Sequence, residues 1–319
     1  MTQATTTRKI IAVVVLTTIV VAGMALYADV RELSDAMASY AIGWFVAGLA
    51  LATANYALRF VRWQYYLRVL DVQGVPWAES ARIFVAGFVM SITPGKVGEV
   101  FKSVLLYESR GVPIEHTAPI VVAERLTDLL ALVLLAAIGS AALGQGMSSV
   151  VIGGSLVLAI WIACAFEPAG ELGLRIAEKL PVLSRIAPKL RDAYGSLRQL
   201  VRPGPFTAAT LLSVVSWFME CVALWLIVRG FGVALGWLES TFVYSAPTIL
   251  GAVALLPGGV GVTEASMTGL LETLGAMEAP EAIGTTLLVR IATLWWAVLL
   301  GVVALAWHRR ALARRDRPD

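Results

Sequence analysis

The sequence predicts an all-α integral membrane protein, a helical bundle with an inverted internal repeat and two re-entrant helical hairpins. The composition predicts the membrane class, because 58% of the 319 residues are hydrophobic and only 15% are charged. The mean hydropathy of +0.79 exceeds what a soluble domain would expose. A pattern that occurs twice along the chain predicts the repeat.

Each copy of this pattern begins with Trp-x-Glu-Ser and continues through an apolar run into Pro-Gly-x-Val-Gly. A lone arginine follows inside an apolar helix. The matching residues are Trp77 and Trp237, Pro94 and Pro257, and Arg125 and Arg290. Their separations drift only from 160 to 165 residues. In a membrane protein, a duplicated unit with a Gly/Pro-broken apolar segment in each half points to a substrate site.

Six uninterrupted apolar stretches approach the roughly twenty residues that cross a bilayer as a helix. They are 10–27, 41–60, 117–143, 148–166, 206–229 and 282–307. The first follows Arg8-Lys9 and could be mistaken for a signal peptide. It is too long for that and lacks a good cleavage site, so we interpret it as a transmembrane helix.

Two further apolar regions, 78–110 and 238–275, are broken near the middle by the Pro-Gly-x-Val-Gly element. Proline removes a backbone donor and glycine accepts unusual conformations, so a continuous helix is not expected. Each arm is roughly 20–27 Å of helix, mostly short of a crossing. We expect both regions to be re-entrant hairpins whose tips lie inside the bundle, where irregular backbone is tolerated.

The basic clusters fix the expected topology. They flank the first hairpin, fill the loop after 148–166 and end the chain, whereas the segments near Asp29 and Glu278 are acidic. Six spans with both termini in the cytoplasm place every basic cluster inside. The first hairpin then enters from the cytoplasm and the second from outside. The expected location is the cell (cytoplasmic) membrane, with multiple passes.

The predicted organisation has five parts. Residues 1–40 hold the first helix and an acidic external loop, 41–143 the first repeat, 144–205 a fourth helix and a basic amphipathic cytoplasmic loop, 206–307 the second repeat, and 308–319 a basic tail. The loop suggests a helix that rests on the anionic leaflet. Whether it senses lipid or only connects the repeats stays open.

Ionisable side chains inside membrane helices are costly and mark candidate sites. We expect two pairs within the repeats, Glu99 with Arg125 and Glu264 with Arg290. The cavity candidates are Arg59, Arg62, Pro94, Gly95, Lys96, Gly98, Glu99, Lys102, Glu124, Arg125, Asp128, Glu220, Pro257, Gly258, Gly259, Gly261, Glu264 and Arg290.

Two interpretations of these charges stay open. They could be buried pairs that only pin hairpin to helix. Alternatively, helix N-termini after Gly98 and Gly261, together with arginines, could bind a lipid phosphate. Glu124, Asp128 and Glu220 could carry a coupling proton or meet a cationic head group. Arg59 and Arg62 could equally extend to the membrane surface.

Neither catalysis nor metal binding is expected. The two histidines, His116 and His308, lie at segment ends, and Cys164 and Cys221 lie within apolar runs. We therefore predict no catalytic residue, no metal, no cofactor and no nucleic-acid partner.

Several segments together resemble a known family. They are Arg59-Phe-Val-Arg-Trp63, Thr93-Pro-Gly-Lys-Val-Gly-Glu99, Glu124-Arg125 with Asp128, Leu256-Pro-Gly-Gly-Val-Gly with Glu264, and Arg290. In order, they resemble the lysylphosphatidylglycerol synthase transmembrane-region (flippase-like) family over about 40–307. The resemblance implies lipid translocation. Beyond Trp307 the chain has twelve residues, five of them arginine, so the family's aminoacyl-transferase activity is not expected.

The leading hypothesis is a flippase or scramblase that moves a phospholipid or glycolipid head group through a cavity between the hairpins. An ion-coupled small-solute transporter is the main alternative, and a membrane enzyme acting on a lipid-linked substrate is the third. Expected partners are membrane lipids, in particular anionic phospholipid or glycolipid. A lipid-modifying enzyme partner and an oligomer stay open.

Overall fold

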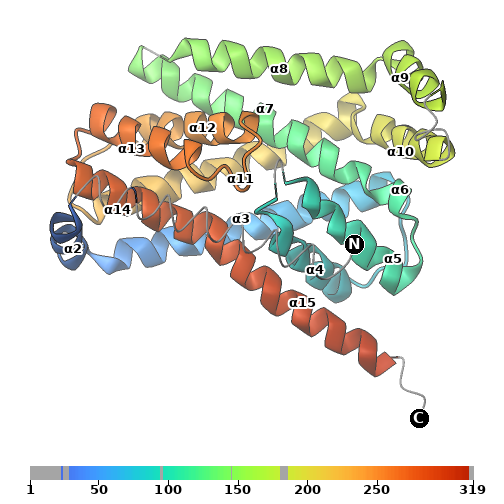
Figure 1. The fold of residues 1–319 in the computed structure, drawn as a ribbon, viewed down its shortest axis with the longest axis horizontal. Helices are drawn as coiled ribbons and strands as arrows, with labels where there is room; N and C mark the ends of the chain where they lie inside the picture. Colours follow the sequence, from blue (N-terminus) through green and yellow to red (C-terminus); the bar gives the residue numbers. More distant parts are fainter. Residues whose placement is uncertain (1–22, 24–28, 94–95, 145, 180–185, 316–319) are drawn as a thin grey trace.

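The computed structural model describes residues 23, 29–93, 96–144, 146–179 and 186–315, and the elements in these ranges are helices, with a single bridge residue at Pro257 (Figure 1). The predicted all-α class is therefore confirmed. The predicted helix at 10–27 lies, apart from Gly23, outside the described residues.

The helices of the first half are α2 (Val30–Ala38), α3 (Ile42–Val69), α4 (Trp77–Ala86), the 3₁₀ segments η1 (Gly87–Met90) and η2 (Val97–Val100), α5 (Phe101–Arg110), α6 (Ile114–Thr117) and α7 (Pro119–Leu143). Those of the second half are α8 (Met147–Ala165), α9 (Glu167–Lys179), α10 (Ala187–Leu200), α11 (Pro203–Arg229), α12 (Trp237–Val253), α13 (Val262–Leu274), α14 (Ala279–Arg290), the π-helical η4 (Ile291–Trp295) and α15 (Trp296–Arg315).

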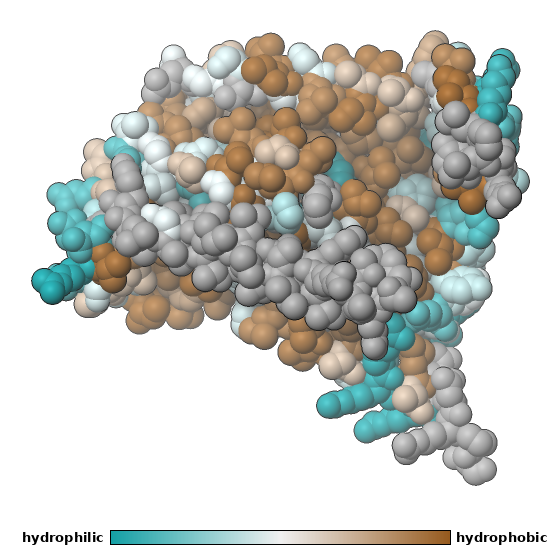
Figure 2. Space-filling view, viewed as in Figure 1, coloured by the Kyte–Doolittle hydropathy of each residue, from teal (hydrophilic) through white to brown (hydrophobic). Residues whose placement is uncertain are grey.

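Four of the described helices are long and apolar enough to cross a membrane: Ile42–Val69, Ile114–Leu143, Pro203–Arg229 and Ala279–Arg314. A fifth candidate joins Val150–Ala165 to Gly170–Ile176 across a 72° bend. Where Figure 2 shows described residues across the middle of the molecule, they are mostly hydrophobic, while hydrophilic residues gather at the α2 end and around α9, α10 and the last turns of α15. A broad apolar surface between polar ends is typical of a protein embedded in lipid.

Helices α3 and α11 run antiparallel and pack against each other. The backbone N–H of Ala41, before α3, donates to the carbonyl of Gly230, after α11, at 3.0 Å. Farther along, Arg62 of α3 bonds Ser213 of α11. Because the two helices run in opposite directions, the N-terminal end of α3 packs against the C-terminal end of α11, and the C-terminal end of α3 against the N-terminal end of α11.

Each of the two apolar regions with a central break forms a pair of helical arms. The arm α4–η1 ends at Met90 and η2–α5 begins at Val97, while α12 ends at Val253 and α13 begins at Val262. In Figure 1 the pair α4–α5 occupies the half of the bundle near α6, and the pair α12–α13 occupies the half near α2. The breaks therefore interrupt both regions where the sequence predicted them.

The two pairs pack in a reciprocal way, because α4 and η1 lie on α15 whereas α12 lies on α7. A glycine permits each contact. A methyl group on Gly139 of α7 would lie 2.7 Å from the Phe242 nitrogen, and one on Gly301 of α15 would lie 2.6 Å from the Val89 nitrogen. The two glycines are 162 residues apart, within the range of the sequence repeat.

The segment between the halves contains α8, α9 and α10. Of the amphipathic loop, 180–185 lie outside the described residues, and α10 packs against α6, α7 and α9 with Ser196 and Leu200 buried. Ion pairs such as that between Arg198 and Glu167, at 2.9 Å, connect α10 to α9. Helix α10 therefore packs on α6 and α7 of the first half of the chain.

Candidate functional site

Two arginines of α3 lie inside the bundle. Arg59 and Arg62 are only 7% and 1% exposed. The Nη1 of Arg62 lies 2.6 Å from Asp128 Oδ1 on α7 and also bonds the hydroxyl of Ser213 on α11. The alternative that both arginines extend to the membrane surface is therefore wrong. Arg62 is bonded to partners inside the bundle, and Arg59 is buried beside it.

The first helix break brings a second set of charges next to these arginines. Lys96 adopts a left-handed conformation with φ of 54°, and η2 begins directly after it. Glu99 and Lys102 follow, and each is 1% exposed. Pro94 and Gly95 lie outside the described residues.

Helix α7 completes the arrangement with three charged residues in two turns. The predicted pair of Glu99 and Arg125 is present, with 3.4 Å between Oε2 and Nη2. Arg125 also lies 3.2 Å from Asp128, and Lys102 Nζ lies 2.7 Å from Glu124 Oε2. The carboxylates of Glu124 and Asp128, four residues apart, are thus each paired with a cation, which offsets their mutual repulsion.

We call this connected group the charge cluster. It comprises Arg59, Arg62, Glu99, Lys102, Glu124, Arg125 and Asp128. Four of its members are basic and three are acidic, so the cluster carries a surplus positive charge. Beside it, the ammonium of Lys96 lies 5.6 Å from the centre of the Trp217 ring, whose N–H donates to Asp128 at 3.0 Å.

Arg59 is the least firmly paired cation of the charge cluster. Its nearest carboxylate oxygen, on Glu99, is 3.9 Å away. Its guanidinium lies 5.4 Å from the Phe88 ring centre, and its Nε has no hydrogen-bond partner among the described residues. A buried charge without full pairing costs several kcal/mol, so an anion bound here would be stabilised.

The second repeat has a corresponding ion pair, Arg290 with Glu264, which carries no net charge. The predicted pair of Arg290 and Glu264 is present at 2.7 Å, and Arg290 also donates to the carbonyl of Gly258 at 2.6 Å. The break itself uses left-handed backbone at Gly258, Gly259 and Gly261, with φ of 61°, 69° and 92°. Pro257 precedes them. Arg290 therefore holds the break against α14 through both side chain and backbone.

The predicted phosphate site at two helix N-termini needs correction. In the second repeat α13 does begin after Gly261, but the N–H of Gly261 donates to Glu264 at 2.7 Å, so a carboxylate already occupies this N-terminus. In the first repeat the helical segment begins earlier, at Val97, and the N–H of Gly98 donates to the Thr93 hydroxyl. Side chains of the protein, rather than open N–H groups, satisfy these positions.

Glu220 of α11 has different surroundings. It is 3% exposed, and its carboxylate accepts hydrogen bonds from the Asn55 amide and, at 3.2 Å, from the Tyr244 hydroxyl. Among the described residues no cation lies within ion-pair distance of it. Of the three carboxyl groups considered as proton carriers, Glu220 is bonded to neutral donors alone among the described residues, whereas Glu124 and Asp128 each pair with a cation.

The neutral partners in these groups are not among the residues predicted from the sequence. Asn55, Ser213, Trp217 and Tyr244 donate to buried carboxylates or accept from arginine. A lone amide in an apolar helix, as at Asn55, was an available signal. Trp217 and Tyr244 look like ordinary apolar residues of their helices, so their roles become visible only in three dimensions.

The chain is similar to proteins already grouped as a family. Residues 10–301 match the family described as the lysylphosphatidylglycerol synthase TM region. A UPF0104 membrane protein of Methanothermobacter thermautotrophicus is 26% identical over 83% of this chain and 84% of its own length. A second such protein of that organism is 20% identical over 95% and 96% of the two chains. One of Pyrococcus horikoshii is 21% identical over 79% and 83%.

Proposed function

Because the chain belongs to the lysylphosphatidylglycerol synthase TM region family of multi-pass membrane proteins, we propose that it moves a lipid across the bilayer, as a flippase or scramblase. The observation that carries this proposal is the surplus positive charge buried in the charge cluster. Arginine recognises phosphate through paired, charge-assisted hydrogen bonds. The head group would therefore be an anionic phospholipid or glycolipid.

Contact between the two helix breaks supports a path through the middle of the bundle. A methyl group on Gly258, in the second break, would lie 3.8 Å from the Cα of Ile92 in the first. Irregular backbone at membrane depth occurs where it lines a polar path or is buried in protein. The charge cluster includes Glu99 and Lys102, which follow the first break directly.

We further propose that the two halves form an inverted repeat with two re-entrant hairpins. The antiparallel course of α3 and α11 and the reciprocal packing at Gly139 and Gly301 support this arrangement. Both termini would lie in the cytoplasm, since α9, α10 and the last turns of α15 carry basic side chains at one end of the bundle. Rocking of one repeat against the other would then expose the charge cluster to each side in turn.

The experiment is translocation of fluorescent lipids by the purified chain in vesicles. The lipids would carry anionic, zwitterionic and cationic head groups, and Arg59→Gln would be compared with the wild type. We expect transport of the anionic lipid, reduced about tenfold or more in the variant, since a charged hydrogen bond contributes roughly 1.5–3 kcal/mol. The control Arg191→Gln removes an exposed arginine that pairs with Glu178. Movement of none of these lipids by the wild type would refute the proposal.

Glu220 favours a second candidate, an ion-coupled transporter of a small solute. A buried carboxyl group held by the neutral donors Asn55 and Tyr244 is suited to binding and releasing a proton. This candidate predicts solute uptake that a proton gradient drives and Glu220→Gln abolishes, without lipid movement. Lipid movement that persists without any gradient favours the first candidate.

A further inference from the structure

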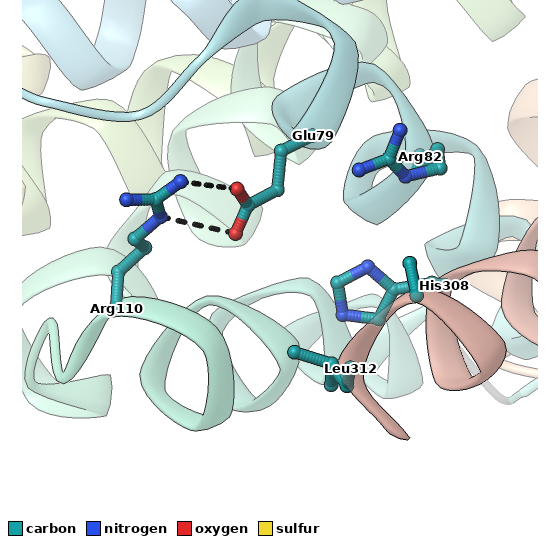
Figure 3. Close-up of a pocket in the computed structure, with 6 residues that line it drawn as sticks. Glu79, Arg82, Arg110, His308 and Leu312 are labelled. Carbon is teal, nitrogen blue, oxygen red and sulfur yellow. Dashed lines mark hydrogen bonds and ion pairs between the residues drawn. The ribbon is translucent and has the colours of Figure 1, made fainter. Parts of the chain in front are cut away.

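A polar pocket outside the charge cluster lies between α4, α5 and α15 (Figure 3). It has a volume of about 170 Å³ and is lined by Glu79, Arg82, Arg110, His308, Ala311 and Leu312. This volume exceeds what a single water molecule needs. Nothing in the proposed transport path uses these residues.

The acidic side chain of the pocket is held by a neighbouring arginine. Arg110 Nε donates to Glu79 Oε1 at 3.0 Å, and its Nη2 bonds the second oxygen, as Figure 3 shows. This two-point pairing offsets the charge of Glu79. Arg82 therefore leaves the pocket with a surplus positive charge.

The guanidinium of Arg82 stacks on an aromatic ring, and among the described residues its Nε does not pair with a carboxylate. Its guanidinium carbon lies 5.2 Å from the centre of the Trp307 ring. The buried Nε has no hydrogen-bond partner among the described residues. Stacking on an aromatic face fixes the orientation of a guanidinium without using its donors.

The contacts of His308 determine which ring nitrogen carries a proton. The Ser109 hydroxyl donates to the carbonyl of Leu105 at 2.7 Å, so its oxygen must accept in the 3.1 Å contact with His308 Nε2. The neutral ring then carries its proton on Nε2, and Nδ1 is an acceptor. Nδ1 is buried and has no partner among the described residues. In Figure 3 one ring nitrogen of His308 points toward the space beside Glu79 and Arg82.

We propose that this pocket binds a phosphomonoester that shares a proton with His308. Arg82 donates to the phosphate oxygens, and a P–OH group donates to Nδ1 of His308. A phosphodiester has no P–OH and would require an additional proton on the imidazole. The ligand is either a lipid head group or a soluble phosphate, since both present the same chemistry. The inference does not depend on lipid transport.

The test is titration of the purified full-length chain in detergent with three probes: dioctanoyl phosphatidic acid, dioctanoyl phosphatidylglycerol and inorganic phosphate. We expect saturable binding of phosphatidic acid and at least tenfold weaker binding of phosphatidylglycerol. Equal binding of inorganic phosphate would assign the same site to a soluble ligand. Equal affinity for the monoester and the diester would overturn the proposal.

Matched variants locate the binding. Arg82→Gln and His308→Gln should each weaken phosphatidic acid binding about tenfold. The glutamine amide at 308 can still donate to Ser109 but offers nothing at the Nδ1 position. Arg309→Gln is the control, because it removes a charge from the same helix whose pairing is with Glu108. Unchanged binding in both pocket variants, or loss in Arg125→Gln instead, would show that the phosphate binds elsewhere.

Discussion

Arg59 and Arg62 lie three residues apart on α3, yet their pairing differs. Arg62 contacts Asp128 at 2.6 Å, whereas the nearest carboxylate oxygen of Arg59 is 3.9 Å away. Removing Arg62 takes away an ion pair at 2.6 Å and leaves Asp128 with the 3.2 Å pair to Arg125. Removing Arg59, in contrast, breaks no ion pair shorter than 3.9 Å among the described residues. Substitution of Arg62 should therefore mainly lower stability, and substitution of Arg59 should mainly lower transport.

We predict that Arg62→Gln lowers the free energy of unfolding by about 1.5–3 kcal/mol, the usual contribution of a hydrogen bond to a charged group, because Asp128 keeps its second pair with Arg125. Arg59→Gln should change it much less while it reduces transport. Thermal unfolding of the two purified variants in the same detergent measures the difference. Equal loss of stability in both would contradict the assigned pairing.

The pair of Arg290 and Glu264 permits a double-mutant cycle. Each single change, Arg290→Gln or Glu264→Gln, leaves a buried charge and should be strongly destabilising. The double variant should be more stable than either, because the neutral side chains leave no charge unpaired. Free energies of unfolding of the four proteins give the coupling energy, and simple additivity would argue against a largely buried pair at 2.7 Å.

Among the helices, close backbone contacts between the two halves occur at Gly139 and Gly301. At each position an added methyl group would lie within 2.7 Å of a backbone nitrogen of the other half. Overpacking of this kind typically costs about 1–3 kcal/mol. These glycines therefore set how closely α12 and α7, and η1 and α15, approach each other.

Gly139→Ala and Gly301→Ala should each lower the melting temperature. Gly43→Ala in α3 is the control, because no atom lies within 4 Å of a methyl group there. In an α-helix that substitution alone should be neutral or slightly stabilising. A control that loses as much stability as the two variants would show that close packing is not the cause.

For the molecule as a whole, hydrophobicity and breaks in the sequence predicted the main architecture. Long apolar runs became α3, α7, α11 and α14–α15, because few other structures satisfy backbone groups in lipid. Both pairs, Glu99 with Arg125 and Glu264 with Arg290, also followed from their repeated spacing.

The rest depended on three-dimensional contacts. Nothing in the sequence places Lys102 on Glu124, or Arg62 on Asp128, because each pair joins different helices. The capping of α13 by Glu264 competes with the anion site predicted there. The π-helical segment after Arg290, at Ile291–Trp295, has no marker that the sequence analysis used. Hydrophobic patterns specify which segments enter the membrane, but not which polar groups meet inside it.

The proposed lipid transport depends most on the inverted repeat, in which the two hairpins would enter from opposite membrane faces. Trp77 and Trp237 begin the first arms of the two hairpins at matching positions of the repeat, and both are exposed. A cysteine at each, in a background with Cys164 and Cys221 replaced, would be treated with a membrane-impermeant maleimide in intact cells. We predict labelling at position 237 from outside, and at position 77 only after the membrane is opened. Labelling of both positions from the same side would contradict the inverted repeat and the transport path derived from it.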